Sequence, residues 1–501
     1  MEATSSTLPA AQESGRRLRG SVLVIIMVAL LLTAFLEALD NLIVTPALPR
    51  IASSLHGFDH YTWVVTAYLL AATAVVPLAG KLSDLFGRKG FLLGGVVIFL
   101  LGSGLAGASQ TMDQLILFRA LQGLGTGIGI GLVATVVGDL FSPEERASKQ
   151  GLLGIVFGVS QLCGPTLGGW ITDHGPLVAG LVAEDTRWRW LFYLNLPIGL
   201  LALLVLWIFL PGQVARRSGF GRIDWWGAGL LVVATCSLLL GLSARSSDWT
   251  SPPVIALFVA AVVFYVLFFI VERKAVEPII PLGLLWHRIF GVDALLTFIQ
   301  GMVLIAVFIP LSLFLQGVLT LSPTEAGVLI TVLSVSLSLG AALAGGIISL
   351  RKRYQMAAIV GAVMMTVGAL LLAIMSMTQQ SNILLIGFYL VLVGLGTGSF
   401  FAIQMVVAQN VIPQTQLGVG SGVIRYLSQL GLTLGAALMG IVVNGAVAGD
   451  MGTGLPATNA ARLALSGVLQ NGFGVVLVLS VLVLIATLFL KDVPGAQPEG
   501  E

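Results

Sequence analysis

The chain has 501 residues, of which 57% are hydrophobic and 10% are charged, whereas an average soluble domain has about 25% charged residues. This composition excludes an ordinary soluble domain and predicts an all-α integral membrane protein. The formal net charge of +2 is too small to indicate binding to nucleic acid. The two cysteines lie inside apolar runs, which argues against a disulfide scaffold.

Apolar runs of membrane-spanning length follow one another along most of the chain. A helix that crosses a bilayer needs about 20 predominantly apolar residues, and the runs lack the short alternating strands of a transmembrane barrel. Hydropathy and helix-breaking residues together predict fourteen spanning helices, at residues 21–48, 61–80, 90–109, 113–138, 150–172, 190–210, 224–243, 253–271, 289–317, 326–348, 355–377, 382–406, 418–446 and 472–490.

The lysines and arginines fall mainly on one side of this series of spans. Cytoplasmic loops are enriched in basic residues, so the distribution predicts a multi-pass protein of the plasma (inner) membrane with both termini in the cytoplasm. Arg16, Arg17 and Arg19 precede the first span and resemble the charged region of a signal peptide. The apolar run that follows is longer than a signal core and has no cleavage site, so we expect it to be retained as a helix.

Parts of the first half of the chain recur in the second. The sequence GLGTG occurs at Gly123–Gly127 and again at Gly394–Gly398. Repeated halves are typical of transporters, whose substrate site lies between the halves near the bilayer midplane. The repeat predicts a tail at residues 1–20, a six-helix half at 21–212, an inserted helix pair at 213–274, a second six-helix half at 275–491 and a tail at 492–501.

The first predicted span carries two carboxylates, Glu37 and Asp40, inside its apolar run. An ionised side chain near the middle of a spanning helix costs about 2.5–3.5 kcal/mol on insertion scales, so it is by default a functional candidate. The two acids are three residues apart and share one face of the helix. We expect this face to line a water-reachable cavity, where a bound proton drives the movement of a substrate. The alternative is that both acids face only an outer vestibule.

Three further charged residues lie inside predicted spans and not at their first or last residue. Arg119 needs a carboxylate, carbonyl groups or water as its partner, and it could either assist a cavity carboxylate or act as a structural anchor. Asp293 lies near the charged loop that ends at Arg288, which favours an interfacial position. Arg425 lies in the cytoplasmic third of its span and matches no motif.

The most specific string is Gly80-Lys-Leu-Ser-Asp-Leu-Phe-Gly-Arg-Lys89, in the turn between the second and third spans. It is similar at nearly every position to the signature of the major facilitator superfamily. Three other strings resemble motifs of its fourteen-helix drug:proton antiporter family: Leu39-Asp40 with Pro46-Ala-Leu-Pro49, Arg119-Ala-Leu-Gln-Gly123, and the fifth-span run with Gly154, Gly158, Gly164, Pro165, Gly168 and Gly169. The second half matches only in layout.

The resemblance implies the major facilitator fold, with two six-helix halves and an inserted helix pair. It also implies a proton-coupled exporter of hydrophobic or cationic compounds that works by alternating access and is not an enzyme. It assigns proton coupling to Asp40 and Arg119, with Glu37 as a second candidate that could instead attract a cationic substrate. It further implies a cytoplasmic gate made of Gly80, Asp84, Gly87, Arg88, Lys89 and Asp139. A solvated position at a loop edge is the simpler interpretation of Asp139.

The glycines of the fifth span recur at four-residue spacing, which lets neighbouring helices approach closely, and Pro165 marks a bend. Aromatic, thioether and amide side chains suit flat, drug-like substrates. We therefore expect the substrate cavity to be lined by Tyr68, Gln122, Phe157, Phe298, Met302, Phe400 and Gln404. For each of the aromatic residues, packing or lipid contact is the alternative.

The expected partners are small hydrophobic or cationic substrates, protons and the lipid bilayer. Nucleic acid is not among them, and the chain is expected to be a monomer. No cofactor is expected, because the proton gradient supplies the energy. An exporter of a dedicated metabolite, siderophore or lipid on the same fold is the runner-up hypothesis. A membrane receptor or scaffold is the alternative from a different class.

Overall fold

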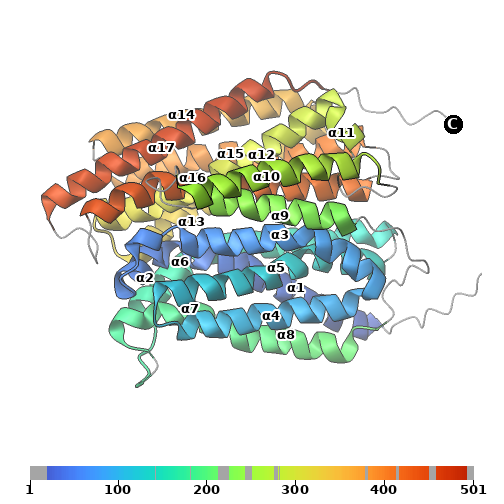
Figure 1. The fold of residues 1–501 in the computed structure, drawn as a ribbon, viewed down its shortest axis with the longest axis horizontal. Coiled ribbons are helices and arrows are strands. Elements are labelled where there is room, and N and C mark those ends of the chain that lie inside the picture. The colour runs from blue at the N-terminus through green and yellow to red at the C-terminus, as the bar shows by residue number, and fades with distance from the viewer. Residues whose placement is uncertain are drawn as a thin grey trace, which may run out of the picture.

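The computed structural model describes residues 20–141, 143–180, 182–212, 225–242, 251–275, 280, 282–351, 353–378, 382–412, 417–450 and 458–492, and for some helical residues in these ranges only the backbone. Long helices run side by side through this part of the chain (Figure 1). The predicted all-α class is therefore confirmed.

Helices of the first half occupy one side of the bundle in Figure 1, and helices of the second half occupy the other. The first set is α1 (Gly20–Ile43), η1 (Thr45–Ala47), α2 (Leu48–Ser54), η2 (Phe58–His60), α3 (Trp63–Phe86), α4 (Arg88–Ala108), α5 (Met112–Leu140), α6 (Pro143–His174), η3 (Glu184–Arg189), α7 (Trp190–Tyr193) and α8 (Asn195–Phe209). The second set is α11 (Leu282–Trp286), α12 (Arg288–Leu313), η5 (Phe314–Val318), α13 (Pro323–Arg351), α14 (Tyr354–Thr378), α15 (Ile383–Val411), α16 (Leu417–Asp450) and α17 (Asn459–Thr487).

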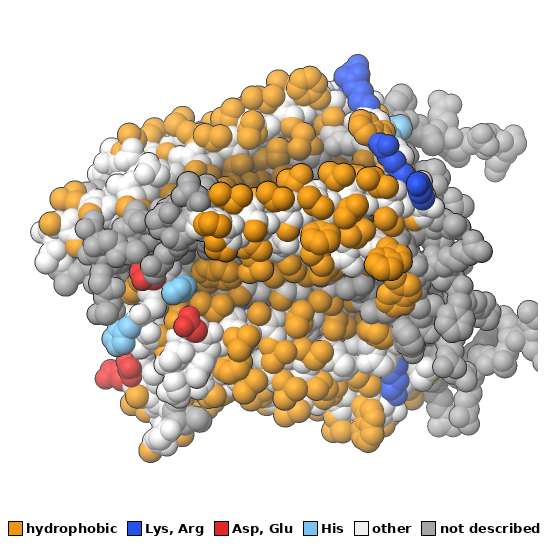
Figure 2. All heavy atoms as spheres, in the orientation of Figure 1, with side chains coloured by type: hydrophobic (Ala, Val, Ile, Leu, Met, Phe, Trp, Pro, Cys, Tyr) orange, Lys and Arg blue, Asp and Glu red, His pale blue; other side chains and the backbone are white. Residues whose placement is uncertain are grey.

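Two helices, α9 (Trp225–Leu242) and α10 (Pro252–Glu272), lie between these sets in the chain and pack against each other. The hydroxyl of Thr235 on α9 lies 3.2 Å from that of Tyr265 on α10 and 3.0 Å from that of Tyr426 on α16. These hydroxyls therefore attach the pair to the second set. The apolar surface that the described side chains present in Figure 2 matches a bilayer as the surrounding solvent.

Among the described residues, thirteen helical segments are long and apolar enough to cross a membrane. They do not include α3, so the total of fourteen spans stays a prediction. Each predicted span overlaps a helix, and the largest difference is that α17 begins at Asn459 and not at 472. Hydropathy misses this first part because it contains Arg462. The helix starts there because the Thr458 hydroxyl accepts a hydrogen bond from the Ala461 amide at 3.2 Å, which is an N-cap.

The repeated glycines hold corresponding helices together in the two sets. A Cβ placed on Gly123 of α5 would lie 2.2 Å from the carbonyl oxygen of Tyr68 on α3. A Cβ on Gly394 of α15 would lie 2.7 Å from the carbonyl oxygen of Leu333 on α13. Because a side chain would clash at both positions, the repeated sequence corresponds to a repeated backbone contact.

The bundle has two chemically different ends. The described lysines and arginines visible in Figure 2 gather at one end, and the visible acidic side chains gather at the other. We call the first the basic end; α4 begins there at Arg88, α12 begins there at Arg288, and α13 ends there at Arg351. We call the opposite end the far end. The basic end is the one that the sequence predicts to be cytoplasmic.

The two sets of helices touch closely toward the far end. A Cβ on Gly169 of α6 would lie 2.1 Å from the carbonyl oxygen of Pro323, at the start of α13. The hydroxyls of Thr166 and Thr331 lie 2.7 Å apart on the same two helices. Further hydrogen bonds between the sets at this end run from Ser312 Oγ to the Thr45 carbonyl (2.8 Å) and from Gln316 Nε2 to the Pro46 carbonyl (2.6 Å). Near the middle of α3 and α16 the hydroxyls of Thr73 and Thr433 also lie 2.9 Å apart.

The glycines of α6 divide into two groups. Gly164, Gly168 and Gly169, near the far end, meet neighbouring helices as predicted. Gly154 and Gly158, nearer the basic end, have no atom within 4 Å of a Cβ built on them, so the expectation of close approach is wrong for these two in this conformation. Close packing of α6 is therefore confined to its far-end part, and free space adjoins Gly154 and Gly158 nearer the basic end. Pro165 lies inside α6, which continues past it.

Gly168→Ala is expected to destabilise the protein, because its Cβ would lie 2.0 Å from the carbonyl oxygen of Ile43 on α1. Overpacking of this kind costs about 1–3 kcal/mol. Gly158→Ala, the same change on the same helix, is expected to be tolerated. The thermal unfolding midpoint in detergent measures both, and equal midpoints would contradict the close contact between α6 and α1.

Candidate functional site

Asp40 is fully buried at the centre of the first set of helices, and its carboxylate is saturated with donors. Arg119 Nη1 on α5 donates to Oδ2 at 2.5 Å. Gln122 Nε2, one turn further along α5, donates to Oδ1 at 2.8 Å, and Asn195 Nδ2 at the start of α8 donates to the same oxygen at 2.9 Å. An ion pair with all its partners in place is the condition under which charges are tolerated inside a membrane bundle.

Arg119 has further partners besides the carboxylate of Asp40. Its Nη1 also donates to Gln122 Oε1 at 2.7 Å, and its Nε donates to the carbonyl of Val64 on α3 at 3.3 Å. Its guanidinium carbon lies 4.2 Å from the centre of the Tyr68 ring and 5.8 Å from that of Phe192, within the range of cation–π attraction. The carboxylate and carbonyl partners that the sequence left as alternatives therefore occur together.

Asn195 is a member of this cluster that the sequence analysis did not select. Its Nδ2 bridges Asp40 Oδ1 and the hydroxyl of Ser103 on α4, each at 2.9 Å, and Ser103 donates in turn to the carbonyl of Phe192 at 2.9 Å. An asparagine inside an apolar span could have been selected as a candidate on its polarity alone. The sequence does not show toward which neighbouring helix that side chain points, so its partners could not be predicted.

Glu37 is buried one turn before Asp40 on α1, but its surroundings are different. Its Oε2 is buried and has no hydrogen-bond partner among the described residues. Its Oε1 covers Gly129 of α5, where a Cβ would lie 2.0 Å away. Among the described residues, no cation forms an ion pair with it. Glu37 thus lies against α5 with one oxygen unbound, whereas every donor around Asp40 is in place.

This arrangement corrects one expectation from the sequence. Glu37 and Asp40 were expected to line a water-reachable cavity together, but Asp40 is 0% exposed and Glu37 is 2% exposed. Residues three apart on a helix differ by about 60° in direction. That offset is enough to bring Asp40 to its donors on α5 and α8 and to leave Glu37 beside Gly129 with one oxygen unbound.

The second set of helices has no charged counterpart of the Asp40 cluster at the repeated positions. Since Gly394 corresponds to Gly123, Arg119 corresponds to Leu390 and Gln122 to Val393. Two buried amides of the second set bind each other and a backbone carbonyl: Gln300 Nε2 donates to the carbonyl of Thr397 at 3.4 Å, and Gln404 Nε2 donates to Gln300 Oε1 at 3.4 Å. The two sets thus share a packing scheme and differ in charge.

Part of the predicted gate is present at the basic end. Arg88 at the start of α4 forms an ion pair with Asp139 near the end of α5 and also donates to the carbonyl of Thr135 at 3.4 Å. Asp139 is therefore bound to Arg88 and not merely solvated. The side chain of Asp84 lies outside the described residues, and Gly80 belongs to α3.

Two other gate residues have structural partners. Lys89 Nζ donates to the carbonyls of Trp207 (2.7 Å) and Leu210 (2.5 Å), at the last turn of α8, where a cation also compensates the negative end of the helix dipole. Gly87 separates α3 from α4 with a φ of +98°, which side chains other than hydrogen rarely permit. The two basic side chains that follow this turn, Arg88 and Lys89, thus attach the start of α4 to α5 and α8.

The residues predicted to line a substrate cavity are mostly enclosed. Tyr68, Gln122 and Phe400 are at most 1% exposed, and Tyr68 packs on Arg119, so the expectation that these three line open space is wrong for this conformation. Met302 and Gln404 are also buried, while Phe157 and Phe298 are half-buried.

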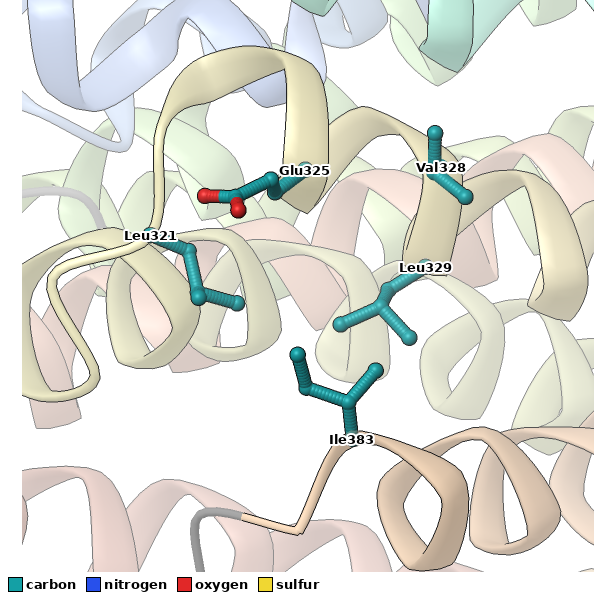
Figure 3. Close-up of a pocket in the computed structure, with 5 residues that line it drawn as sticks. All are labelled: Leu321, Glu325, Val328, Leu329 and Ile383. Atoms are coloured by element: carbon teal, nitrogen blue, oxygen red, sulfur yellow. The ribbon is translucent and has the colours of Figure 1, made fainter.

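Two cavities open on the outside of the bundle. Figure 3 shows the smaller, of about 180 Å³, lined by Leu321, Glu325, Val328, Leu329 and Ile383. The carboxylate of Glu325 has partners within the chain, because its Oε2 accepts hydrogen bonds from the Ser322 amide and hydroxyl. The larger, of about 550 Å³, lies between α14 and α17 and is lined by Ala373, Met377, Gln470, Asn471, Gly474, Val475, Val478 and Leu479. Neither includes the buried charges.

Asp293 differs from its predicted interfacial position. It is 0% exposed on α12, and neither carboxylate oxygen has a hydrogen-bond partner among the described residues. The sequence placed it correctly near the start of its helix, but the direction of the side chain depends on the helices packed around α12. A buried carboxyl without partners is costly.

Helices of spanning length in two repeated sets, with a buried charge cluster in one of them, define a membrane transport protein of the two-lobed, helix-bundle class. The profile of the Major Facilitator Superfamily matches residues 30–223 and 213–436. The chain belongs to the Major Facilitator Superfamily, which confirms the family inferred from the sequence motifs.

Several relatives in sequence cover most of the chain. Multidrug resistance protein 3 of Bacillus subtilis is 36% identical over 421 residues, which are 83% of this chain and 79% of that protein. Multidrug transporter protein MdtP of the same organism is 34% identical over 426 residues, 84% of this chain and 75% of that protein. The efflux pump dotC of Dothistroma septosporum is 36% identical over 416 residues, 82% of this chain and 70% of that protein.

Solved structures agree on the fold. A bacterial homologue of the human lysosomal transporter Spinster, in an inward-facing conformation, superposes with a TM-score of 0.67 at 16% identity and covers 96% of this chain and 100% of its own. A D-xylose–proton symporter superposes with a TM-score of 0.63 at 15% identity and covers 94% of this chain and 98% of its own. At these identities the likeness shows the fold alone.

Asp40→Asn is expected to lower the thermal unfolding midpoint of the detergent-solubilised protein, because it leaves the buried guanidinium of Arg119 without its counter-charge. Breaking a buried ion pair on one side costs about 3–5 kcal/mol. Asp293→Asn makes the same chemical change at a buried carboxyl that has no partner, so its midpoint is expected to be unchanged or higher. An equal loss in both variants would contradict the structural role of the Asp40–Arg119 pair.

Proposed function

We propose that the chain is a proton-coupled exporter of hydrophobic and cationic drug-like compounds that works by alternating access. Relatives that are at least 34% identical over most of the chain are named multidrug resistance or multidrug transporter proteins, which supports the substrate class. We further propose that the chain works as a monomer in the plasma membrane, with its termini in the cytoplasm and the proton gradient as its energy source.

The coupling proposal rests on one observation: the two acids on α1 differ in their hydrogen-bond partners. Asp40 has a cation and two amides around it, whereas Glu37 keeps one carboxylate oxygen without a hydrogen-bond donor among the described residues. Taking up a proton removes the cost of an unpaired buried charge, whereas losing it requires a cation or water nearby. Glu37 is therefore suited to exchange a proton, and Asp40 with Arg119 forms the charged framework beside it.

Alternating access would use the contacts between the two sets of helices. In this conformation hydrogen bonds between the sets gather toward the far end, while Gly154 and Gly158 face open space nearer the basic end. A substrate would enter from the basic end, and the far-end contacts would have to separate before its release. Small residues at the contact keep the barrier to such sliding low, because few side chains interlock.

The direct test is transport into proteoliposomes that hold the purified protein under an imposed pH gradient, followed with the fluorescent cation ethidium. Wild-type protein is expected to accumulate ethidium only while the gradient lasts. Asp40→Asn and Glu37→Gln are both expected to abolish gradient-driven accumulation, because each removes an ionisable group of the proposed coupling site. Asp113→Asn, on the exposed first turn of α5, is the matched acid-to-amide control.

Accumulation that is independent of the gradient would refute proton coupling. Loss in Glu37→Gln but not in Asp40→Asn would identify Glu37 as the sole carrier, and the reverse result would identify Asp40.

A cysteine pair at Thr166 and Thr331 tests alternating access. The two hydroxyl oxygens are 2.7 Å apart, so Thr166→Cys with Thr331→Cys, in a background where Cys163 and Cys236 are replaced by alanine, is expected to form a disulfide. Oxidation should stop transport by holding the far end closed, and a reductant should restore it. Each single cysteine variant serves as control. Full transport by the cross-linked protein would contradict the proposed opening.

A further inference from the structure

The cavity of about 550 Å³ between α14 and α17 lies on the outer face of the second set of helices. These two helices pack against each other at the edge of the bundle in Figure 1. We call the cavity the α14–α17 groove. Its volume falls within the range of small-molecule sites, about 300–1,000 Å³. The groove is therefore large enough to hold a ligand, and it lies outside the site formed by the buried charges of the first set.

The groove combines two amide side chains with an apolar remainder. Gln470 is half-buried and Asn471 is exposed, and neither side chain makes a hydrogen bond with another described residue. One to three turns further along α17 the lining is apolar, with Val475, Val478 and Leu479. An amide that faces hydrocarbon without a partner is costly. The groove therefore suits an amphipathic ligand that has hydrogen-bond acceptors at one end and a hydrocarbon chain at the other.

The two amides lie at the depth of the ester groups of lipids. Ser466 on α17 donates to the carbonyl of Ser376 at 2.8 Å, so it is level with the last turn of α14, which ends at Thr378 near the far end. Gln470 and Asn471 follow one turn later, about 6–8 Å deeper at 1.5 Å per residue. The polar region of each leaflet is about 5–8 Å thick. This depth is the boundary between headgroups and hydrocarbon, where the ester carbonyls of glycerolipids lie.

We propose that the α14–α17 groove binds one glycerolipid of the leaflet at the far end. The ester carbonyls of the lipid accept hydrogen bonds from the Gln470 and Asn471 amides, and an acyl chain lies along the apolar part. The residues that line the groove carry no charge, so the site recognises the neutral ester groups and not a charged headgroup. Binding satisfies both amides and fills the space between α14 and α17.

Two glycines of α17 provide a matched pair of variants. Gly474 lines the groove, and no atom lies within 4 Å of a Cβ built on it. Gly467, two turns earlier, is equally free of neighbours and does not line the groove. A leucine fits at either position without a clash and has the same gain in helix propensity at both. Gly474→Leu therefore fills the space of the acyl chain, whereas Gly467→Leu leaves it open.

The test measures lipid binding to the full-length protein in detergent by native mass spectrometry. The probes are dioleoylphosphatidylcholine and its diether analogue, which keeps the chains and the headgroup but lacks the ester carbonyls. Wild-type protein is expected to bind the first ester lipid about tenfold more tightly than the diether, because a tenfold change in Kd is within the contribution of two hydrogen bonds. Gln470→Leu with Asn471→Leu should remove this preference. Gln355→Leu, near the start of α14 at the basic end, is the matched control.

Gly474→Leu is expected to weaken the binding of both lipids at least tenfold, and Gly467→Leu is expected to bind them as the wild type does. Equal affinity of the wild type for the two lipids, or unchanged binding by Gly474→Leu, would overturn the proposal. A dimer that Gly474→Leu separates would also overturn it, because a second copy of the chain would then occupy the groove. If the double leucine variant does not fold, the wild type and Gly474→Leu decide. The measurement needs neither a gradient nor a substrate, so its outcome does not depend on the proposed export function.

Discussion

The ion pair between Asp40 and Arg119 is the interaction on which the first set of helices depends. Neither charge could remain in the bundle alone, since the cost of burial falls on each side chain separately and is offset only when their groups meet in good geometry. The pair therefore fixes how α1 and α5 lie against each other, and Asn195 extends the constraint to α8. The glycines allow this geometry, because a Cβ on Gly123 would push α5 away from α3, whose Val64 carbonyl binds Arg119.

The two repeated sets have diverged in charge while keeping their backbone contacts. Gly123 and Gly394 make corresponding close approaches, but Leu390 and Val393 stand where the first set has Arg119 and Gln122. The second set has charges of its own in its helices, Arg425 on α16 and the buried Asp293 on α12, but neither lies at a repeated position. One set thus holds an internally balanced cluster and a further acid, Glu37, whose Oε2 is unbound.

Much of this could be predicted from the sequence, and the misses share a cause. Apolar run length predicted the helices, and the string around Gly87 predicted a turn at which Arg88 and Asp139 meet. Residue type alone showed that Arg119 needs a carboxylate, carbonyl groups or water as its partner. The sequence could not show that Asp293 is buried without partners, that Asn195 completes the Asp40 cluster, or that Gly154 faces open space. Each depends on which neighbour a helix face meets, and periodicity along one helix carries no information about rotation relative to another.

The separation of Glu37 from Asp40 shows how a small angular offset becomes a difference in function. The three-residue spacing of the two acids predicted that they share one face of the helix. The offset of about 60° between them is nevertheless enough to give them different surroundings. If both acids had donors as Asp40 has, no carboxylate of α1 would be left unbound. If both lay where Glu37 lies, Arg119 would stay buried and unpaired at a cost of several kcal/mol. Pairing one acid and leaving the other partly unbound gives α1 one charge that holds the helices together and a second group that is free to take up a proton.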